Sequence, residues 1–349
     1  MRHVELAPGH RISRVIKGGW QLAGGHGTVD RETGIEDMIA FADAGITTFD
    51  CADIYTGVEA LIGEFRRTYV RARGAEALTR IKVHTKFVPD LGNLASLTRA
   101  DVVHAIETSL SRLGMERLDL VQFHWWDYEI DRQVEVASWL AELRQQGKIA
   151  NIGGTNFDTR QLQRMLDAGV PMVSMQVQYS LIDDRPARAM AALAAASNVS
   201  LLCYGSVAGG LFSERWLGAQ EPAAPFENRS LAKYKLIVDE FGGWELFQDL
   251  LGVLAAIARR HNCDIASVAS RAVLERPGVA AVIVGARNRS HLVRNLGITD
   301  LALTAEDFGQ IKLVLSRAKS VPGDVYGLER DRNGKHGLVM KYNLNKQGH

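Results

Sequence analysis

A closed α/β barrel of the (β/α)8 TIM type is the fold class that the sequence predicts, on three observations. Eight short runs of apolar and β-branched residues alternate with helical patterns along the chain. The joints between a helix and the next strand are short, as at Ala44-Gly45. No change of composition and no Pro/Ser-rich linker divides the chain, so we expect residues 1–349 to form a single barrel domain.

The individual elements follow from periodicity and from stop signals. In the first predicted helix, Ile35, Met38 and Phe41 are spaced for one buried face, and Gly45 ends the helix. The predicted strands cover residues 14–20, 46–49, 81–87, 118–124, 149–154, 173–177, 199–204 and 279–284. The predicted helices cover residues 33–44, 58–71, 99–113, 131–146, 159–168, 186–197, 244–260, 267–276 and 290–296.

Three segments lie outside this alternation. Residues 1–13 are polar and are expected to form a hairpin that covers one end of the fold. Residues 205–243 read as an irregular stretch too long for a plain connection, so we expect a long active-site loop there. Residues 321–349 have little periodicity and are predicted to form a C-terminal tail over the barrel mouth, with partial disorder as the alternative.

Composition excludes several classes of function. The net charge of +1, from 41 basic and 40 acidic side chains, argues against nucleic acid as a partner. No apolar run reaches about 18 residues, which argues against a membrane span. The polar start with Pro8 is unlike a signal peptide. Three unpaired cysteines indicate a reducing, cytoplasmic location and no cysteine-based metal site.

Polar and aromatic residues collect at the carboxyl ends of the predicted strands, where barrels of this type place their active sites. In chain order these residues are Trp20, Asp50 with Tyr55, Lys86, His124, Thr155-Asn156, Gln176, Tyr204 and Gly285-Ala286-Arg287. Each residue has a simpler explanation when taken alone, such as a turn residue at Asp50 or a helix cap at Thr155. The recurrence at all eight strand ends favours an active site.

Four of these residues have a shared chemical logic. A phenol with a pKa near 10 is a poor acid at neutral pH, and an ammonium such as Lys86 would favour its ionised form. A carboxylate such as Asp50 would hold that ammonium, and His124 would hydrogen-bond a carbonyl oxygen. This arrangement is typical of C=O reduction with a hydride from a nicotinamide cofactor.

The motifs that carry these residues resemble the aldo-keto reductase superfamily. They are Phe49-Asp50-Cys-Ala-Asp-Ile-Tyr55, Lys86 at a strand end, Val121-Gln-Phe-His124 and Gly153-Gly-Thr-Asn-Phe157. The resemblance covers about Trp20 to Asn295. It implies a catalytic tetrad of Asp50, Tyr55, Lys86 and His124, in which Tyr55 is the general acid.

The resemblance also implies how a cofactor is held. Thr155, Asn156 and Gln176 would bind the carboxamide, Tyr204 would stack on the nicotinamide ring, and the pyrophosphate would pass Gly205, Gly209 and Leu211. Further contacts are expected from Gly285, Arg287, Arg289 and Asn295, with the two arginines on a 2′-phosphate or simply on the surface. Members of that family bind NADPH, so the resemblance implies NADPH. Many of them carry a lysine at the position of Gly285 and an arginine at the position of His291, and the loss of both charges here leaves NADH as the alternative.

The substrate is expected to be a small carbonyl compound, with Trp20, Trp125 and Tyr128 as candidate pocket residues. The reverse oxidation of an alcohol fits the same residues. Two other functions stay open: a cofactor-binding subunit without catalysis, and a metal-dependent barrel hydrolase. The second needs a ligand pattern such as His-x-His, and the sequence has only His84-Thr-Lys86 there. No metal and no particular oligomeric state are predicted.

Overall fold

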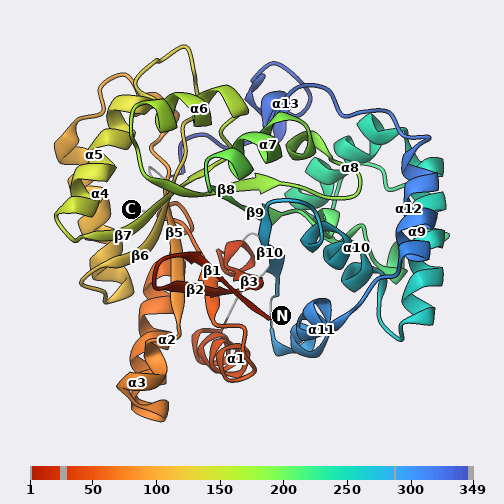
Figure 1. Ribbon diagram of the computed structural model, residues 1–349, viewed down its shortest axis with the longest axis horizontal. Coiled ribbons are helices and arrows are strands. Elements are labelled where there is room, and N and C mark those ends of the chain that lie inside the picture. The colour runs from red at the N-terminus through yellow and green to blue at the C-terminus, as the bar shows by residue number, and fades with distance from the viewer. Residues whose placement is uncertain (1, 24–29, 287, 345–349) are drawn as a thin grey trace.

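The computed structural model describes residues 2–23, 30–286 and 288–344, and its centre is the predicted barrel (Figure 1). Eight parallel strands close in the order β10-β3-β4-β5-β6-β7-β8-β9, which confirms the (β/α)8 fold class. The strands are β3 (Val15–Gly18), β4 (Thr48–Asp50), β5 (Lys82–Phe87), β6 (Leu118–Phe123), β7 (Ile149–Thr155), β8 (Met172–Gln178), β9 (Ser200–Tyr204) and β10 (Val279–Gly285).

Helices surround the barrel, and several begin at a side chain that caps their free backbone N–H groups. Asp158 accepts from the Gln161 N–H, and Thr98 forms a reciprocal capping pair with Asp101. The helices are α1 (Arg31–Asp43), α2 (Val58–Arg73), α3 (Ala75–Leu78), α4 (Arg99–Leu113), α5 (Gln133–Gln145), α6 (Thr159–Asp167), α7 (Ala189–Ala196), α8 (Arg229–Phe241), α9 (Trp244–Arg260), α10 (Ile265–Leu274), α11 (Leu292–Asp300), α12 (Ala305–Leu315) and α13 (Gly327–Arg330).

The N-terminal segment forms the expected hairpin. Strands β1 (His3–Ala7) and β2 (His10–Ser13) pair in antiparallel fashion and lie in front of the barrel strands in Figure 1. Leu6 and Ile12 of the hairpin join a buried cluster with Ile16, Leu120 and Leu202 of the barrel interior. The hairpin therefore closes one end of the barrel, and the opposite end is left for the active site.

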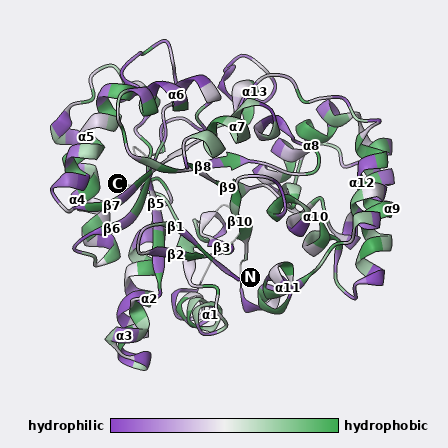
Figure 2. Ribbon diagram, viewed as in Figure 1, coloured by the Kyte–Doolittle hydropathy of each residue, from purple (hydrophilic) through white to green (hydrophobic). Residues whose placement is uncertain are grey.

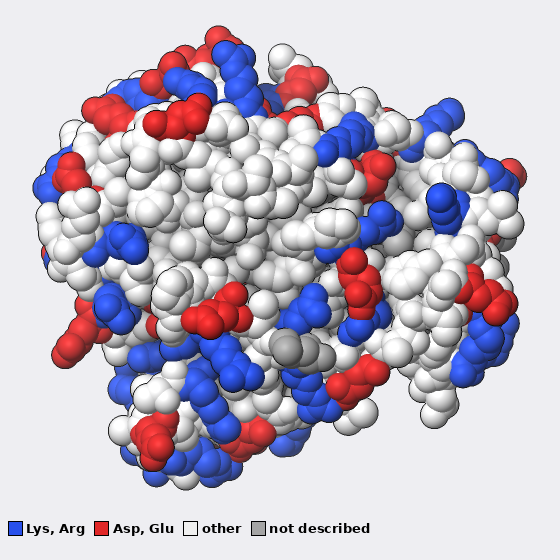
Figure 3. All heavy atoms as spheres, in the orientation of Figure 1, with Lys and Arg blue, Asp and Glu red and all other residues white. Residues whose placement is uncertain are grey.

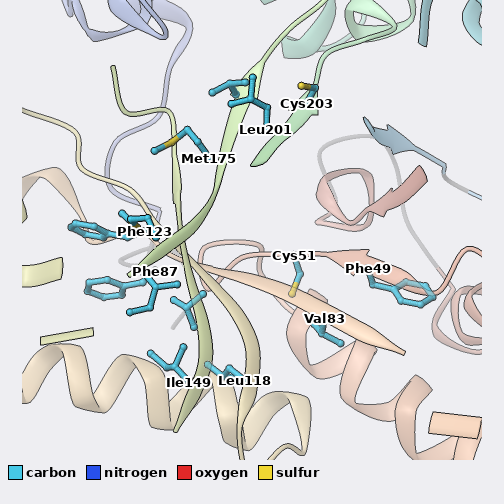
Figure 4. Packing of buried hydrophobic residues seen from close by; sticks show 14 of the residues in the cluster. Phe49, Cys51, Val83, Phe87, Leu118, Phe123, Ile149, Met175, Leu201 and Cys203 are labelled. Atoms are coloured by element: carbon cyan, nitrogen blue, oxygen red, sulfur yellow. The ribbon is translucent and has the colours of Figure 1, made fainter. Parts of the chain in front are cut away.

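The largest buried cluster lies between the strands and their helices. Alternate strand residues such as Phe49, Val83, Phe87 and Phe123 point outward into it (Figure 4), and the Phe87 and Phe123 rings stack 6.0 Å apart. The helices carry hydrophobic and hydrophilic residues together (Figure 2), as expected for a ring with one buried and one solvated face.

Besides the short helices α3 and α13, which were not predicted, the structure differs from the predicted elements in three places. Residues 205–243 are not irregular throughout, because they contain α8, whose Leu231, Ile237 and Val238 are buried in a second cluster with α9 and α10. Helix α12 follows α11 and was not predicted. Strand β3 ends at Gly18, and Trp20 begins a short 3₁₀ helix, Trp20–Leu22.

The C-terminal segment crosses the barrel mouth as predicted, as far as Leu344. Tyr326, Val339, Met340 and Leu344 line the cavity at the mouth. The Leu91 N–H donates to the Tyr342 carbonyl, which ties this segment to the β5 side of the barrel. The last five positions, 345–349, lie outside the described residues.

The molecular surface in Figure 3 carries basic and acidic side chains interspersed with one another. Within the part of the chain that the structure describes, no single helix is long and apolar enough to cross a membrane. The α8 and α9 pair, bent by 98° at its break, passes that test by length and composition only.

Candidate active site

An ion pair from two neighbouring strands forms the base of the site. Asp50 is the last residue of β4 and Lys86 lies near the end of β5, so both side chains reach the barrel mouth. The Lys86 ammonium donates to Asp50 Oδ2 at 2.6 Å and to the Cys51 carbonyl at 2.8 Å. Burial lowers the pKa of Lys86, but Asp50 and Tyr55 outweigh burial and raise it overall, so Lys86 is a permanent cation.

Two glutamines hold the other oxygen of Asp50. Gln122 Nε2 and Gln176 Nε2 donate to Asp50 Oδ1 at 2.9 and 2.7 Å. Gln176 Nε2 also lies 2.9 Å from Gln122 Oε1. The carboxylate is therefore bonded on both oxygens, which fixes its orientation toward Lys86.

Tyr55 lies over this ion pair and faces the cavity. The Lys86 Nζ atom is 5.1 Å from the centre of the Tyr55 ring, and the Trp20 ring packs edge-on against it at 5.1 Å. Burial raises the pKa of Tyr55 while Lys86 lowers it, and burial prevails. The expected lowering by Lys86 is thus present but smaller than the effect of burial, and Tyr55 keeps its proton at neutral pH.

His124 follows the end of β6 and faces the same cavity. Its Nδ1 atom lies 2.9 Å from the Thr155 carbonyl, which only accepts hydrogen bonds, so Nδ1 carries a proton. Burial and the nearby Arg330 lower the pKa of His124 to about 3, so the ring is neutral. Its Nε2 therefore carries a lone pair, and this atom has no partner within the described residues.

The ends of β7, β8 and β9 bring Thr155, Asn156, Gln176 and Tyr204 to the same mouth, where all four line the cavity. Asn156 has a left-handed backbone with φ of 61°, and its Oδ1 accepts from the Tyr204 hydroxyl at 2.8 Å. That bond fixes both side chains relative to each other.

These groups surround one cavity of about 480 Å³, with a smaller pocket of about 70 Å³ beside it. The predicted residues that line the main cavity are Trp20, Asp50, Tyr55, Lys86, His124, Thr155, Asn156, Gln176, Tyr204, Gly205, Gly209 and Gly285. Asn295 lines the smaller pocket, where its Oδ1 is buried without a partner in the described chain. Gly285 borders both.

The structure corrects the two predicted aromatic substrate contacts. The Trp125 side chain is completely buried, and its indole N–H donates to the Ile130 carbonyl at 2.9 Å. The Tyr128 ring is covered by the Arg330 guanidinium at 3.9 Å, and its hydroxyl accepts from the Asp158 N–H. The residue between them, Trp126, lines the cavity instead. Side chains alternate along an extended chain, so His124 and Trp126 share a face that Trp125 does not.

Two of the predicted cofactor contacts that the structure describes, Leu211 and Arg289, line neither pocket. The Leu211 side chain is fully buried in the second hydrophobic cluster, so only its backbone is available to a ligand. Arg289 is 64% exposed and lies 3.8 Å from Asp37. Arg287 lies outside the described residues. His291 and Arg294, which follow Arg289 in the sequence and were not predicted as cofactor contacts, do line the cavity.

Comparison with known proteins identifies the family of this chain. The model of the aldo/keto reductase family matches residues 14–315. The chain belongs to the aldo/keto reductase family. Its relatives include the aldo-keto reductase YhdN of Bacillus subtilis (strain 168), which is 29% identical over 331 residues. That similarity covers 92% of this chain and 96% of YhdN. The NADH-specific methylglyoxal reductase of Escherichia coli (strain K12) is 21% identical over 322 residues, 85% of this chain and 92% of that relative.

Solved structures of the family show the same fold. The thermostable aldo-keto reductase Tm1743, crystallised with the inhibitor epalrestat, has a TM-score of 0.68 at 26% identity, over 90% of this chain and 99% of that chain. The glycerol dehydrogenase AKR11B4 from Gluconobacter oxydans has a TM-score of 0.75 at 23% identity, over 93% and 98% of the two chains. Family membership makes this protein an oxidoreductase of the class that uses nicotinamide cofactors.

The residues present fit such a cofactor. Tyr204, Asn156 and the buried, unpaired Asn295 Oδ1 offer a ring and polar groups, while cationic side chains of the cavity suit phosphates. Two glycines of the cavity wall pack closely against neighbouring side chains: a Cβ on Gly209 would lie 2.6 Å from Tyr234 Cδ2, and one on Gly285 would lie 2.1 Å from Gln21 Nε2.

Sequence reasoning missed several residues of the site. Gln122 lies two residues before His124 on β6, and this spacing places both on one face of the strand. Lys233 and Tyr326 line the cavity from α8 and from the tail. The alternation of side chains along β6 could have predicted Gln122. Lys233 and Tyr326 could not have been predicted in this way, since they reach the cavity through tertiary packing. Among the described residues, no group of three or more His, Cys, Asp or Glu is placed to hold a metal ion.

Proposed function

We propose that this aldo/keto reductase reduces an aldehyde or a ketone with NADPH, and that Tyr55 is the general acid. The observation that carries the proposal is the position of Tyr55, a protonated phenol in the cavity directly beside the buried Lys86–Asp50 pair. A nicotinamide cofactor, when bound, supplies the hydride that reduces the carbonyl carbon. The protein supplies the proton for the carbonyl oxygen from the Tyr55 hydroxyl.

Lys86 stabilises the phenolate that Tyr55 becomes after giving up its proton. Its ammonium remains charged because Asp50 holds it at 2.6 Å, and the two glutamines hold Asp50. The negative charge that develops on Tyr55 thus meets a fixed cation in a desolvated cavity, where such an interaction is strong. In alcohol oxidation the same pair favours the phenolate as the base.

The sequence predicts that His124 donates a hydrogen bond to the carbonyl oxygen of the substrate, and we propose a different role for it. A neutral ring with a proton on Nδ1 presents a lone pair at Nε2, so it accepts a hydrogen bond and does not donate one. We infer that Nε2 orients the hydroxyl of Tyr55 or of the alcohol. Trp126, packed edge-on against His124 at 4.3 Å, excludes water from that side.

The cofactor preference follows from the charges of the cavity. Arg294 lines the cavity beside Gly285, and we propose that it contacts the 2′-phosphate of NADPH, with Arg287 as a second candidate. The relative from Escherichia coli is NADH-specific, so NADH is the alternative for this chain.

Titration of the protein with NADPH and with NADH, followed by tryptophan fluorescence, tests the class and the preference. Trp20 and Trp126 line the cavity and report on binding there. We expect tighter binding of NADPH, and we expect Arg294→Met to weaken NADPH by about tenfold more than NADH, since a charge-assisted contact is lost. Equal weakening of both would remove Arg294 from the 2′-phosphate. Failure of wild-type protein to bind either cofactor, or to reduce any of a panel of aldehydes and ketones, would reject the proposed function.

A further inference from the structure

The charged side chains of the main cavity are predominantly basic, and three of them, Arg229, Lys233 and Lys341, have no acidic partner among the described residues. The described basic residues are Lys86, Arg229, Lys233, Arg294 and Lys341, and the described acid is Asp50. Asp50 is paired with Lys86, Arg294 lies 3.4 Å from Asp264, and Arg229 donates to the Val339 carbonyl. Lys341 is exposed to solvent.

Lys233 differs from the other cations. Among the described residues its ammonium has neither a hydrogen-bond acceptor nor an acidic partner, and the undescribed positions include no Asp or Glu. Three tyrosine rings surround it instead: Nζ lies 5.1 Å from the ring centre of Tyr204, 5.5 Å from that of Tyr234 and 5.6 Å from that of Tyr326. Burial among these rings lowers the pKa of Lys233, and Glu329 opposes that effect from a distance.

The aromatic cage stabilises the ammonium only in part. Ring faces attract a cation, but they do not accept its hydrogen bonds as water or a carboxylate does. The neighbouring acids are already committed, because Asp183 and Glu329 both bind Arg185 at 2.7 to 3.0 Å. A desolvated ammonium that faces a cavity without its own acid is arranged to receive an anion from outside.

The cage adjoins the residues proposed for the chemistry. The Tyr326 ring packs edge-on against the His124 ring at 5.8 Å, and Tyr204 is hydrogen-bonded to Asn156. Tyr55 lines the same cavity as Tyr234 and Tyr326. Lys233 therefore lies beside the carbonyl-reducing end of the cavity, while Arg294 and His291 border it after β10.

Building on the proposed function, we propose that Lys233 binds a carboxylate of the substrate, so that this reductase prefers aldehydes or ketones that carry an acid group. One ammonium with no second cation in its cage matches a singly charged carboxylate, whereas a phosphate needs more donors. The nicotinamide cofactor also carries anionic groups, and the experiment is designed to separate these two sources of negative charge.

The test compares 4-formylbenzoate with its methyl ester, which has a similar shape and no charge. We expect wild-type protein to prefer the acid, and Lys233→Met to lower the acid-to-ester ratio of kcat/KM by at least about tenfold, mainly through the KM of the acid. Lys233→Arg should retain the preference. Lys235→Met is the matched control, because Lys235 lies on the same helix but is neutralised by Glu221 and Asp239.

A binding measurement gives a readout that does not depend on turnover. Calorimetry on the protein saturated with NADP+ should show that Lys233→Met weakens benzoate but not the neutral benzamide. An unchanged acid-to-ester ratio and unchanged benzoate binding in Lys233→Met would overturn the proposal. So would a loss of NADPH affinity with equal effects on both aldehydes, which would assign Lys233 to the cofactor. If wild-type protein reduces neither aldehyde, the proposed function fails and calorimetry alone decides whether Lys233 binds a carboxylate.

Discussion

The role proposed for Tyr55 as the general acid depends on the groups that surround its hydroxyl. Burial keeps the phenol protonated, and Lys86 is already in place to stabilise the phenolate. Lys86 in turn depends on Asp50, whose two oxygens are fully engaged with Lys86 and the two glutamines. In the proposed mechanism the reactive group is the Tyr55 hydroxyl, and Lys86, Asp50 and the two glutamines set the charge around it.

Replacing Tyr55 with phenylalanine removes that hydroxyl and little else. We expect kcat for aldehyde reduction to fall by about 10²–10⁴, the usual contribution of a general acid, with little change in the dissociation constant of the cofactor. Steady-state kinetics with a fluorescence titration of the cofactor measures both quantities. Tyr69→Phe is the control, because Tyr69 loses a hydroxyl that bonds to Asp43 on α1, far from the cavity. Turnover near the wild-type rate in Tyr55→Phe would remove Tyr55 from the mechanism.

The C-terminal tail acts as a structural element of the site although most of it is irregular. Arg185, buried between Asp183 and Glu329, ties α13 to the segment after β8. Arg330 then donates to the carbonyls of Trp125, Trp126 and Asn156, which belong to the segments after β6 and β7. The tail therefore holds His124 and Asn156 in position and contributes Tyr326 to the cavity.

Arg330→Met tests this function of the tail. The variant leaves three carbonyls without their shared donor, so we expect a loss of roughly 2–4 kcal/mol in the free energy of unfolding and faster hydrogen exchange in α13. The loss of the nearby positive charge also lessens the lowering of the His124 pKa.

Urea unfolding and amide exchange measure these effects, and Arg332→Met is the control. Arg332 is in the same tail, but it is 54% exposed and pairs only with Asp127. Equal stability of the two variants would show that Arg330 does not anchor the tail.

The whole barrel is closed at its other end by a pair of histidines between the hairpin and β5. The His10 and His84 Nε2 atoms lie 3.0 Å apart, and the two rings stack with centres 5.2 Å apart. One ring must donate and the other accept, so both must be neutral or share a single proton. Burial lowers the pKa of His10 from 6.5 to about 4 and that of His84 further.

This pair predicts how stability depends on pH. In the unfolded chain these histidines bind protons below about pH 6.5. In the folded chain His10 does so only below about pH 4. The free energy of unfolding therefore keeps its full value above about pH 6.5 and declines as the pH falls below it. For His10 alone the loss between these values is about 3 kcal/mol. We expect His10→Gln to show a smaller fall in the urea midpoint between pH 7 and pH 5 than the wild type. His104→Gln, at an exposed position on α4, is the control, and parallel pH curves for all three proteins would contradict the assignment.

The sequence by itself determined the fold and the residues at the strand ends. Eight apolar runs separated by helical periods allow few arrangements other than a barrel, and parallel strands in a barrel bring their carboxyl ends to one mouth. Asp50, Lys86, His124 and Tyr204 were therefore predictable, because each belongs to a strand end or follows one directly. Trp126 was not, because it lies beyond the end of β6, and only the folded connection shows that Trp126 faces the cavity while Trp125 is buried.

Only the tertiary structure decided the groups that reach the site from elsewhere in the chain. Lys233 arrives on a helix within a segment that looked irregular, and Tyr326 and Arg330 arrive on a tail without periodicity. Local sequence patterns carry no information on such contacts, because they depend on how α8 and the tail pack over the barrel. The protonation states of Tyr55 and His124 were likewise decided by burial and by single hydrogen-bond partners, which exist only in the folded chain.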